Sequence, residues 1–181
     1  MNLTGFFRKS AGLTFIAGNL NLLAFGGDLT VSGALLLATS ASLFASAKNP
    51  KWLYAAGGSM ITAWGIIGLN SNGDGAFLQT IAPAFAFAQG ALLMRAGYNL
   101  TTDNAPISFN GILGKVFNKI DKYTLASAGA IELPGTLLAT GAAVLSDNIP
   151  LMISAGLWSI ANGLLIASDP ALRKNNDVKP Q

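Results

Sequence analysis

The chain has 181 residues, of which 51% are hydrophobic and only 10% are charged, and its formal net charge is +3. An ordinary soluble domain carries about 25% charged residues, so this composition indicates a membrane protein. The sequence contains no Cys and no His. This excludes disulfides, thiol and imidazole catalysis and most transition-metal sites, and we expect neither an enzyme nor a bound cofactor or metal.

Apolar runs follow one another along the whole chain. Even the shortest, with 17 residues, extends about 25 Å as a helix, close to the roughly 30 Å of hydrocarbon in a bilayer. The first run follows Arg8 and Lys9 as in a signal peptide, but no clear cleavage site comes after it, so we expect a true span. The predicted fold is an all-α integral membrane bundle of six transmembrane helices. The runs lie at residues 10–26, 29–47, 52–69, 76–94, 123–145 and 149–168.

The basic residues predict an orientation. If the N-terminus is cytoplasmic, all 11 Lys and Arg residues fall in inner segments, and the outer turns carry only Asp28, Asp74 and Asp147 as charged residues. Cytoplasmic segments of membrane proteins are enriched in Lys and Arg. Both termini are therefore predicted to be cytoplasmic.

The six runs pair into three helical hairpins, at residues 10–47, 52–94 and 123–168, within a single membrane domain over 1–181. Each hairpin has a Gly/Ala-rich first helix, an outer turn with one Asp and a second helix with a polar or basic end. Matching segments such as 22–26 and 137–141 favour parallel repeats around an axis along the membrane normal. The alternative is a chance alignment of Ala, Leu and Gly.

The segment at residues 95–122 is the longest connector and is predicted to be cytoplasmic. Apolar residues recur at helical spacing between Phe109 and Ile120, while Lys115, Lys119 and Lys122 fall largely on the other side. This pattern predicts an interfacial amphipathic helix that contacts anionic lipid. The alternative is a docking surface for a cytoplasmic protein. The tail at 169–181 is polar and predicted to be mobile.

Glu132 is the only acid well inside a predicted span, about 13 Å from Tyr123 by helix rise. A carboxyl group at this depth costs several kcal/mol unless it is neutral, paired or hydrated. Pro134 follows and is expected to kink the helix. An acid beside a broken helix is typical of ion, proton or substrate sites in transporters. The alternative is a protonated Glu132 that bonds a neighbouring helix and is purely structural.

Other polar residues at similar depth are candidates for the lining of a polar cavity, or else for hydrogen bonds between helices. Trp64 and Trp158 also lie deep, where they flank a ligand pocket or pack against lipid. Ala86-x-x-x-Gly90 and Ser159-x-x-x-Gly163 allow close helix contacts, which serve either packing inside the bundle or a partner. The candidate polar residues are Asn19, Asn21, Ser42, Thr62, Gln89 and Asn162.

In length and hairpin plan the chain resembles the small bacterial inner-membrane proteins of the YgjV type. The shared pattern is an amide inside an apolar run, as in Ala161-Asn162-Gly163-Leu164-Leu165, followed by a basic end. The resemblance covers the whole chain; it implies a cell inner membrane and no particular activity. Mitochondrial carriers also have three two-helix repeats, but their Pro-x-acid-x-x-base motif is missing here.

Taken together, these features favour a small-solute or ion transporter with a midplane site. The alternative is a non-catalytic subunit of a larger membrane complex or a homo-oligomer. Basic residues are few and dispersed, so we expect no nucleic-acid partner.

Overall fold

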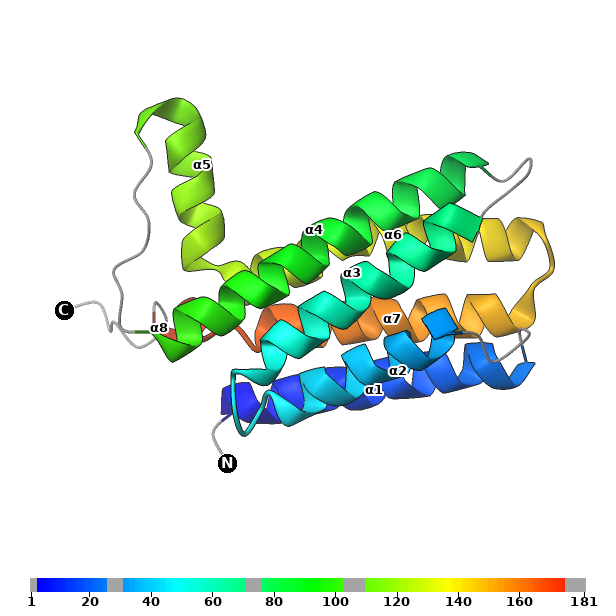
Figure 1. The fold of residues 1–181 in the computed structure, drawn as a ribbon, viewed down its shortest axis with the longest axis horizontal. Helices are drawn as coiled ribbons and strands as arrows, with labels where there is room; N and C mark the ends of the chain where they lie inside the picture. The colour runs from blue at the N-terminus through cyan, green and yellow to red at the C-terminus, as the bar shows by residue number, and fades with distance from the viewer. Residues whose placement is uncertain (1–2, 26–30, 71–75, 103–109, 175–181) are drawn as a thin grey trace.

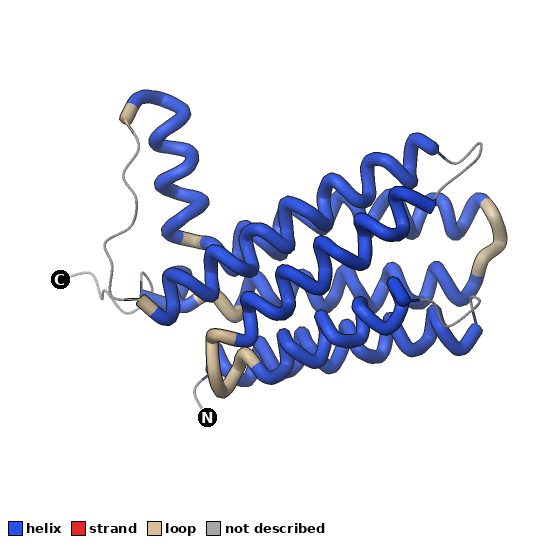
Figure 2. Tube along the Cα trace, in the orientation of Figure 1, coloured by secondary structure: helices blue, strands red, loops and turns tan. Residues whose placement is uncertain are grey.

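The computed structural model describes residues 3–25, 31–70, 76–102 and 110–174. Within these ranges the chain forms eight α-helices and no strand (Figure 2), which confirms the all-α prediction. The helices are α1 (Leu3–Phe25), α2 (Val31–Ala45), α3 (Trp52–Asn70), α4 (Ala76–Thr101), α5 (Gly111–Lys122), α6 (Thr124–Leu145), α7 (Ile149–Ala167) and α8 (Pro170–Lys174).

Six long helices form a closed ring (Figure 1). Helices α1, α2, α3, α4, α6 and α7 each pack on the next in this order, and α7 returns to pack on α1. The pairs α1–α2, α3–α4 and α6–α7 are antiparallel hairpins that stand side by side. The ring encloses a central space that receives side chains from every one of its helices.

Three of the ring helices, α3, α6 and α7, are long and apolar enough to cross a membrane by length and composition. Over the described residues, α2 has 15 residues, and α1 and α4 are long enough but less apolar. Helix α1 carries Arg8, Lys9 and two Asn residues, and α4 continues past the predicted run through Arg95 to Thr101. The prediction of six spans is thus supported directly for three helices.

Large apolar side chains cover the outside of the ring. Leu137, Leu145 and Ile160 are 64%, 90% and 58% exposed, whereas the polar side chains of Gln89 and Asn162 are fully buried. A soluble protein rarely buries polar groups while it exposes so many large apolar ones. This distribution is typical of helices whose outer surface contacts lipid and whose polar groups face one another.

Glycines allow close contact between neighbouring helices. A Cβ added to Gly90 of α4 would lie 2.7 Å from Ile61 Cγ1 and 2.9 Å from the Gly57 carbonyl oxygen of α3. The close contact predicted at Gly90 is confirmed. At Gly163 no close contact forms within the bundle, because Gly163 is exposed and a Cβ there would meet nothing within 4 Å among the described residues. The contact with a partner that this motif also allows stays a prediction.

Helix α5 projects sideways from one end of the ring (Figure 1). The helix predicted in the connector is present from Gly111 onward, and residues 103–109 lie outside the described ranges. Its apolar side chains are uncovered, with Ile112 and Leu113 at 84% and 73% exposed. Near the C-terminal end of α5, Asp121 forms a bidentate ion pair with Arg95 of α4, with N–O distances of 2.6 and 3.0 Å.

Most basic segments gather at the end of the ring where α5 lies. The start of α1, the α2–α3 turn, the end of α4 and helix α8 all lie there, and the α6–α7 turn with Asp147 lies at the opposite end (Figure 1). This separation of charge along the bundle axis matches the arrangement expected for a protein that crosses a bilayer.

The beginning of the polar tail is not free of the bundle, contrary to expectation. Asp169 is only 3% exposed. Its carboxylate accepts hydrogen bonds from the backbone N–H groups of Ala126 and Ala171, both at 2.9 Å. Because the first turn of a helix has unpaired N–H groups, Asp169 caps α6 from a distant part of the chain. Residues 175–181 lie outside the described ranges.

Candidate functional site

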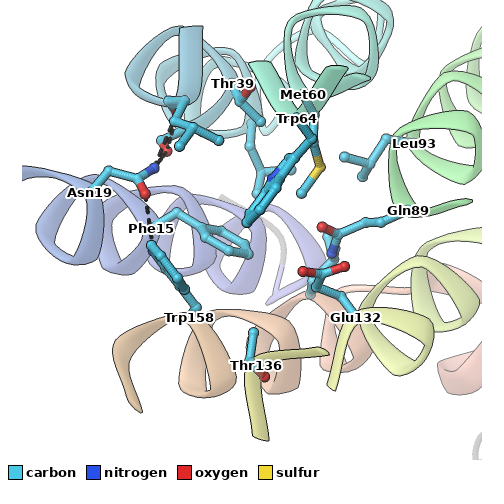
Figure 3. Close-up of a pocket in the computed structure, with 14 residues that line it drawn as sticks. Phe15, Asn19, Thr39, Met60, Trp64, Gln89, Leu93, Glu132, Thr136 and Trp158 are labelled. Atoms are coloured by element: carbon cyan, nitrogen blue, oxygen red, sulfur yellow. Dashed lines mark hydrogen bonds between the residues drawn. The ribbon is translucent and has the colours of Figure 1, made fainter. Parts of the chain in front are cut away.

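A small cavity lies at the centre of the ring and is lined by residues of all six ring helices (Figure 3). The space open to the centre of a water-sized sphere is about 30 Å³. One water needs about 10–15 Å³ on this measure, so the cavity has room for about two water molecules. The polar residues of its lining are Asn19, Thr39, Ser40, Gln89, Glu132 and Thr136, and the aromatic ones are Phe15, Trp64 and Trp158.

Glu132 provides the only carboxyl group of this lining within the described part of the chain. Its side chain is 6% exposed, and Oε2 is fully buried without a hydrogen-bond partner among the described residues. Gly135, one turn further on, leaves room beside the carboxyl group, since a Cβ there would lie 3.5 Å from Glu132 Oε1. Buried carboxyl groups of this kind normally have a partner, which indicates that a water or a proton-carrying group belongs next to Oε2.

Two amide side chains form a pair beside this carboxyl group. Gln89 of α4 donates from Nε2 to Asn162 Oδ1 of α7 at 2.7 Å. The pair leaves Gln89 Oε1 and Asn162 Nδ2 buried without partners in the described structure. Figure 3 shows the Glu132 and Gln89 side chains extending into the cavity from adjacent helices. Gln89 and Glu132 therefore bring an orphan amide oxygen and an orphan carboxyl oxygen to the lining of a space large enough for two waters, whereas the sequence candidate Asn162 pairs with Gln89 and is not itself part of this lining.

Asn19 also faces the cavity, but its hydrogen bonds are complete. Nδ2 donates to Ser40 Oγ at 2.9 Å and to the Leu36 carbonyl at 3.2 Å. Oδ1 accepts from Trp158 Nε1 at 3.0 Å (Figure 3). This side chain ties α1 to α2 and to α7, which is the structural alternative for a deep polar residue.

Asn21 lies in the contact between α1 and α7 and not in the cavity lining. Its Nδ2 donates to the Pro150 carbonyl at 2.8 Å and to Ser154 Oγ at 3.0 Å. Asn21 therefore also links two helices.

Three further sequence candidates do not reach the cavity. Thr62 is exposed on α3, because residues 60 and 64 of this helix face inward and position 62 points the opposite way. Its hydroxyl donates a hydrogen bond to the Gly58 carbonyl of the same helix at 2.9 Å. Ser42 is buried but lies beside the inward-facing column of α2. Pro134 is exposed, and helix α6 continues through it from Thr124 to Leu145.

On α1, α3 and α6, lining residues that the sequence analysis did not single out lie one turn from those that it did. Phe15 is four residues before Asn19, and Thr136 is four residues after Glu132. Met60 has the same relation to Trp64. Spacing by four residues keeps side chains on one helix face, and this signal was available in the sequence once one inward residue was known.

A second buried charge lies nearer the basic end. Arg8 is 6% exposed, its Nη1 donates to the Ser46 carbonyl at 3.1 Å, and Nε is buried without a partner among the described residues. The Asp169 carboxylate attracts the Arg8 guanidinium electrostatically. Arg8 lies about two helical turns from the cavity along α1, because it precedes Phe15 by seven positions.

We compared the chain with protein-family models, with curated proteins and with solved structures, and found no match in any of the three. The functional assignment therefore depends on the geometry of the site.

Proposed function

We propose that the chain crosses a cell inner membrane six times with both termini in the cytoplasm. Helices α3, α6 and α7 meet the length and hydropathy requirements, and α1, α2 and α4 fill the ring between them. Two of the candidate spans, α6 and α7, are adjacent, whereas α3 packs mainly on α4, which leads to α6, and on α2, which leads through α1 to α7. If these three cross the bilayer, the intervening helices cross it too. The likeness to the YgjV-type proteins belongs to this proposal and assigns no activity.

The same proposal includes a transport function, in which Glu132 carries a proton through the ring. The observation behind it is the buried Glu132 Oε2, which has no partner among the described residues and belongs to the lining of a small central cavity with room for about two waters. A space for about two waters excludes all but the smallest solutes in this conformation.

A proton suits the site better than a metal cation. Ca²⁺ takes six to eight oxygen ligands, and Mg²⁺ keeps an octahedral shell. The described residues contain no group of three or more acidic or other metal-binding side chains, and the cavity lining has one carboxyl group. One carboxyl group is sufficient to take up and release a proton, and intramembrane acids serve in this way in pumps and transporters.

The residues around Glu132 have distinct roles in this proposal. Water in the cavity donates to Gln89 Oε1 and so is held in place beside the carboxyl group, while Asn162 positions Gln89 by accepting from its Nε2. Access alternates between the two membrane faces as hairpins move against one another. The alternative assignment, an accessory subunit or a homo-oligomer, uses the same polar groups only to hold helices together.

The test is proton flux in proteoliposomes that contain a pH-sensitive dye and carry an imposed pH gradient. Wild-type protein should collapse the gradient, and Glu132→Gln and Glu132→Leu should both fall to the leak of protein-free vesicles. Thr62→Val is the matched control, because Thr62 has a similar depth but faces outward. Its flux should equal that of the wild type.

Thermal stability in detergent is measured beside the flux. A structural role predicts that Glu132→Gln is nearly silent and that Glu132→Leu stabilises the fold, since burying a carboxyl group is costly. Wild-type flux from Glu132→Leu would remove Glu132 from the transport path.

A further inference from the structure

A groove of about 520 Å³, measured as the space open to the centre of a water-sized sphere, lies between α5 and the start of α6. Residues from α7 and α8 complete its wall. This volume is within the range of about 300–1,000 Å³ that is usual for small-ligand sites. It is separate from the cavity at Glu132, and none of its lining residues is shared with that cavity.

One side of the groove is cationic. Lys115 and Lys119 are one helical turn apart on α5, and both are exposed. The lining contains no acidic residue, and the one ion pair of the described residues, Arg95–Asp121, uses neither lysine. Two ammonium groups that project from one helix face toward an apolar wall favour a ligand with a negative charge.

The opposite side is apolar and runs along the bundle. Ala126 and Ala130 are one turn apart on α6, so this part of the wall extends about 6 Å along that helix. Ile166 of α7 and Leu172 of α8 face the same space, and Leu172 is 39% exposed. A ligand that fills the groove therefore has an anionic head and an apolar chain.

We propose that this groove binds one anionic glycerophospholipid of the cytoplasmic leaflet. Its phosphate lies between Lys115 and Lys119, and the first part of an acyl chain follows Ala130 and Ile166. Basic pockets beside transmembrane helices on the cytoplasmic side are suited to anionic headgroups. The uncovered apolar side chains of α5, Ile112 and Leu113, place this helix at the same membrane level. The site is independent of proton transport at Glu132.

The measurement is lipid retention by the full-length protein in detergent, followed by native mass spectrometry. Phosphatidylglycerol and phosphatidylcholine with identical acyl chains are titrated in parallel. Wild-type protein should retain one phosphatidylglycerol in preference to phosphatidylcholine. Lys115→Gln/Lys119→Gln should bind it about 30-fold more weakly, from the usual contribution of two lysines at an anionic surface.

Two further variants distinguish a lipid site from diffuse charge attraction and from a site for a bare anion. Lys48→Gln/Lys51→Gln removes the same charge from the α2–α3 turn, outside the groove, and should retain phosphatidylglycerol as the wild type does. Ala130→Phe keeps both lysines and fills the apolar wall, and it should also weaken binding.

Three outcomes would overturn the proposal. The first is equal retention of the two lipids by the wild type. The second is an equal loss in the Lys48/Lys51 variant, which would mean diffuse attraction at the membrane surface. The third is unchanged binding in Ala130→Phe together with competition by glycerol phosphate, which would mean an anion site without a chain, open to a free phosphate or an acidic protein segment.

Discussion

At the scale of single residues, Asn19 joins three helices through one amide. It donates to Ser40 and Leu36 of α2 and accepts from the Trp158 indole of α7. Asn19→Ala should lower the free energy of unfolding by about 1–3 kcal/mol, because it leaves the buried indole N–H without an acceptor. Thermal unfolding in detergent, followed by circular dichroism, measures the loss.

Thr62→Val is the control for this prediction. The Thr62 side chain faces outward and bonds only its own helix in the described structure, so its removal should change stability by less than about 0.5 kcal/mol. Equal losses in the two variants would mean that water replaces the bonds of Asn19, and that the link between the helices contributes nothing.

The polar character of the cavity could be predicted from single residues of the sequence, but the direction in which each side chain points could not. Glu132 and Gln89 are candidates because they are polar residues deep inside predicted spans, and both reach the cavity. Thr62 was selected on the same ground and points outward. In these helices apolar residues occur on every side, so a helical period that marks the inner face is nearly absent. Facing is decided by the packing of neighbouring helices.

At the scale of elements, α5 is positioned by the contact between Arg95 and Asp121. The hydrogen bonds from Arg95, followed by that from Asn99, hold the pKa of the Asp121 carboxyl below its ordinary value of 3.8. Because this pKa is lowered in the folded protein, the contact contributes its full stability above pH 3.8 and loses it as the pH falls below that value. Helix α5 should therefore loosen from the bundle only in strong acid.

A spin label tests this at one position. The chain has no Cys, so Phe117→Cys provides a unique attachment point on the exposed side of α5. Label mobility should stay constant from pH 8 to about pH 4 and rise below it. Asp121→Asn should show the mobile spectrum already at neutral pH. If the label mobility rose around pH 6 in the protein that keeps Arg95 and Asp121, the loosening would be caused by the titration of another group.

Elements differed in how far their sequences determined them. The presence of α5 and its two faces followed from the recurrence of Ile, Leu, Val and Phe at helical spacing, with Lys largely on the other side, which is a strong local signal, whereas its start at Gly111 was not predicted. Mean hydropathy does not identify α1 and α4 as membrane spans, because polar residues that face the cavity or lie at the basic end lower the average over the whole helix. The two-pronged Arg95–Asp121 pair joins residues 26 positions apart, and no local pattern predicts it.

At the scale of the whole molecule, the ring closes because α7 packs on α1. Hairpins in chain order account for the contacts between successive helices, but three hairpins also permit an open row. Closure depends on long-range contacts such as Gly18 against Trp158, where a Cβ would lie 2.8 Å from Nε1. Asn21 adds a bond across 133 positions to Ser154. The central cavity exists only in the closed arrangement, so the sequence provided its polar residues without its shape.

The proposed orientation of the ring in the membrane is argued from its charges and can be tested with single cysteines. Asp147→Cys lies in the exposed α6–α7 turn, opposite the end that holds the α2–α3 turn with Lys48 (Figure 1). In intact cells an impermeant thiol reagent should label Asp147→Cys, and it should label Lys48→Cys and Lys119→Cys only after lysis. The other outer positions, Asp28 and Asp74, lie outside the described ranges.

Labelling of Lys119→Cys in intact cells would reverse the orientation and move the lipid groove to the outer leaflet. Labelling of both Asp147→Cys and Lys48→Cys would mean that the two ends of the ring face the same compartment, and the ring would then not cross the bilayer.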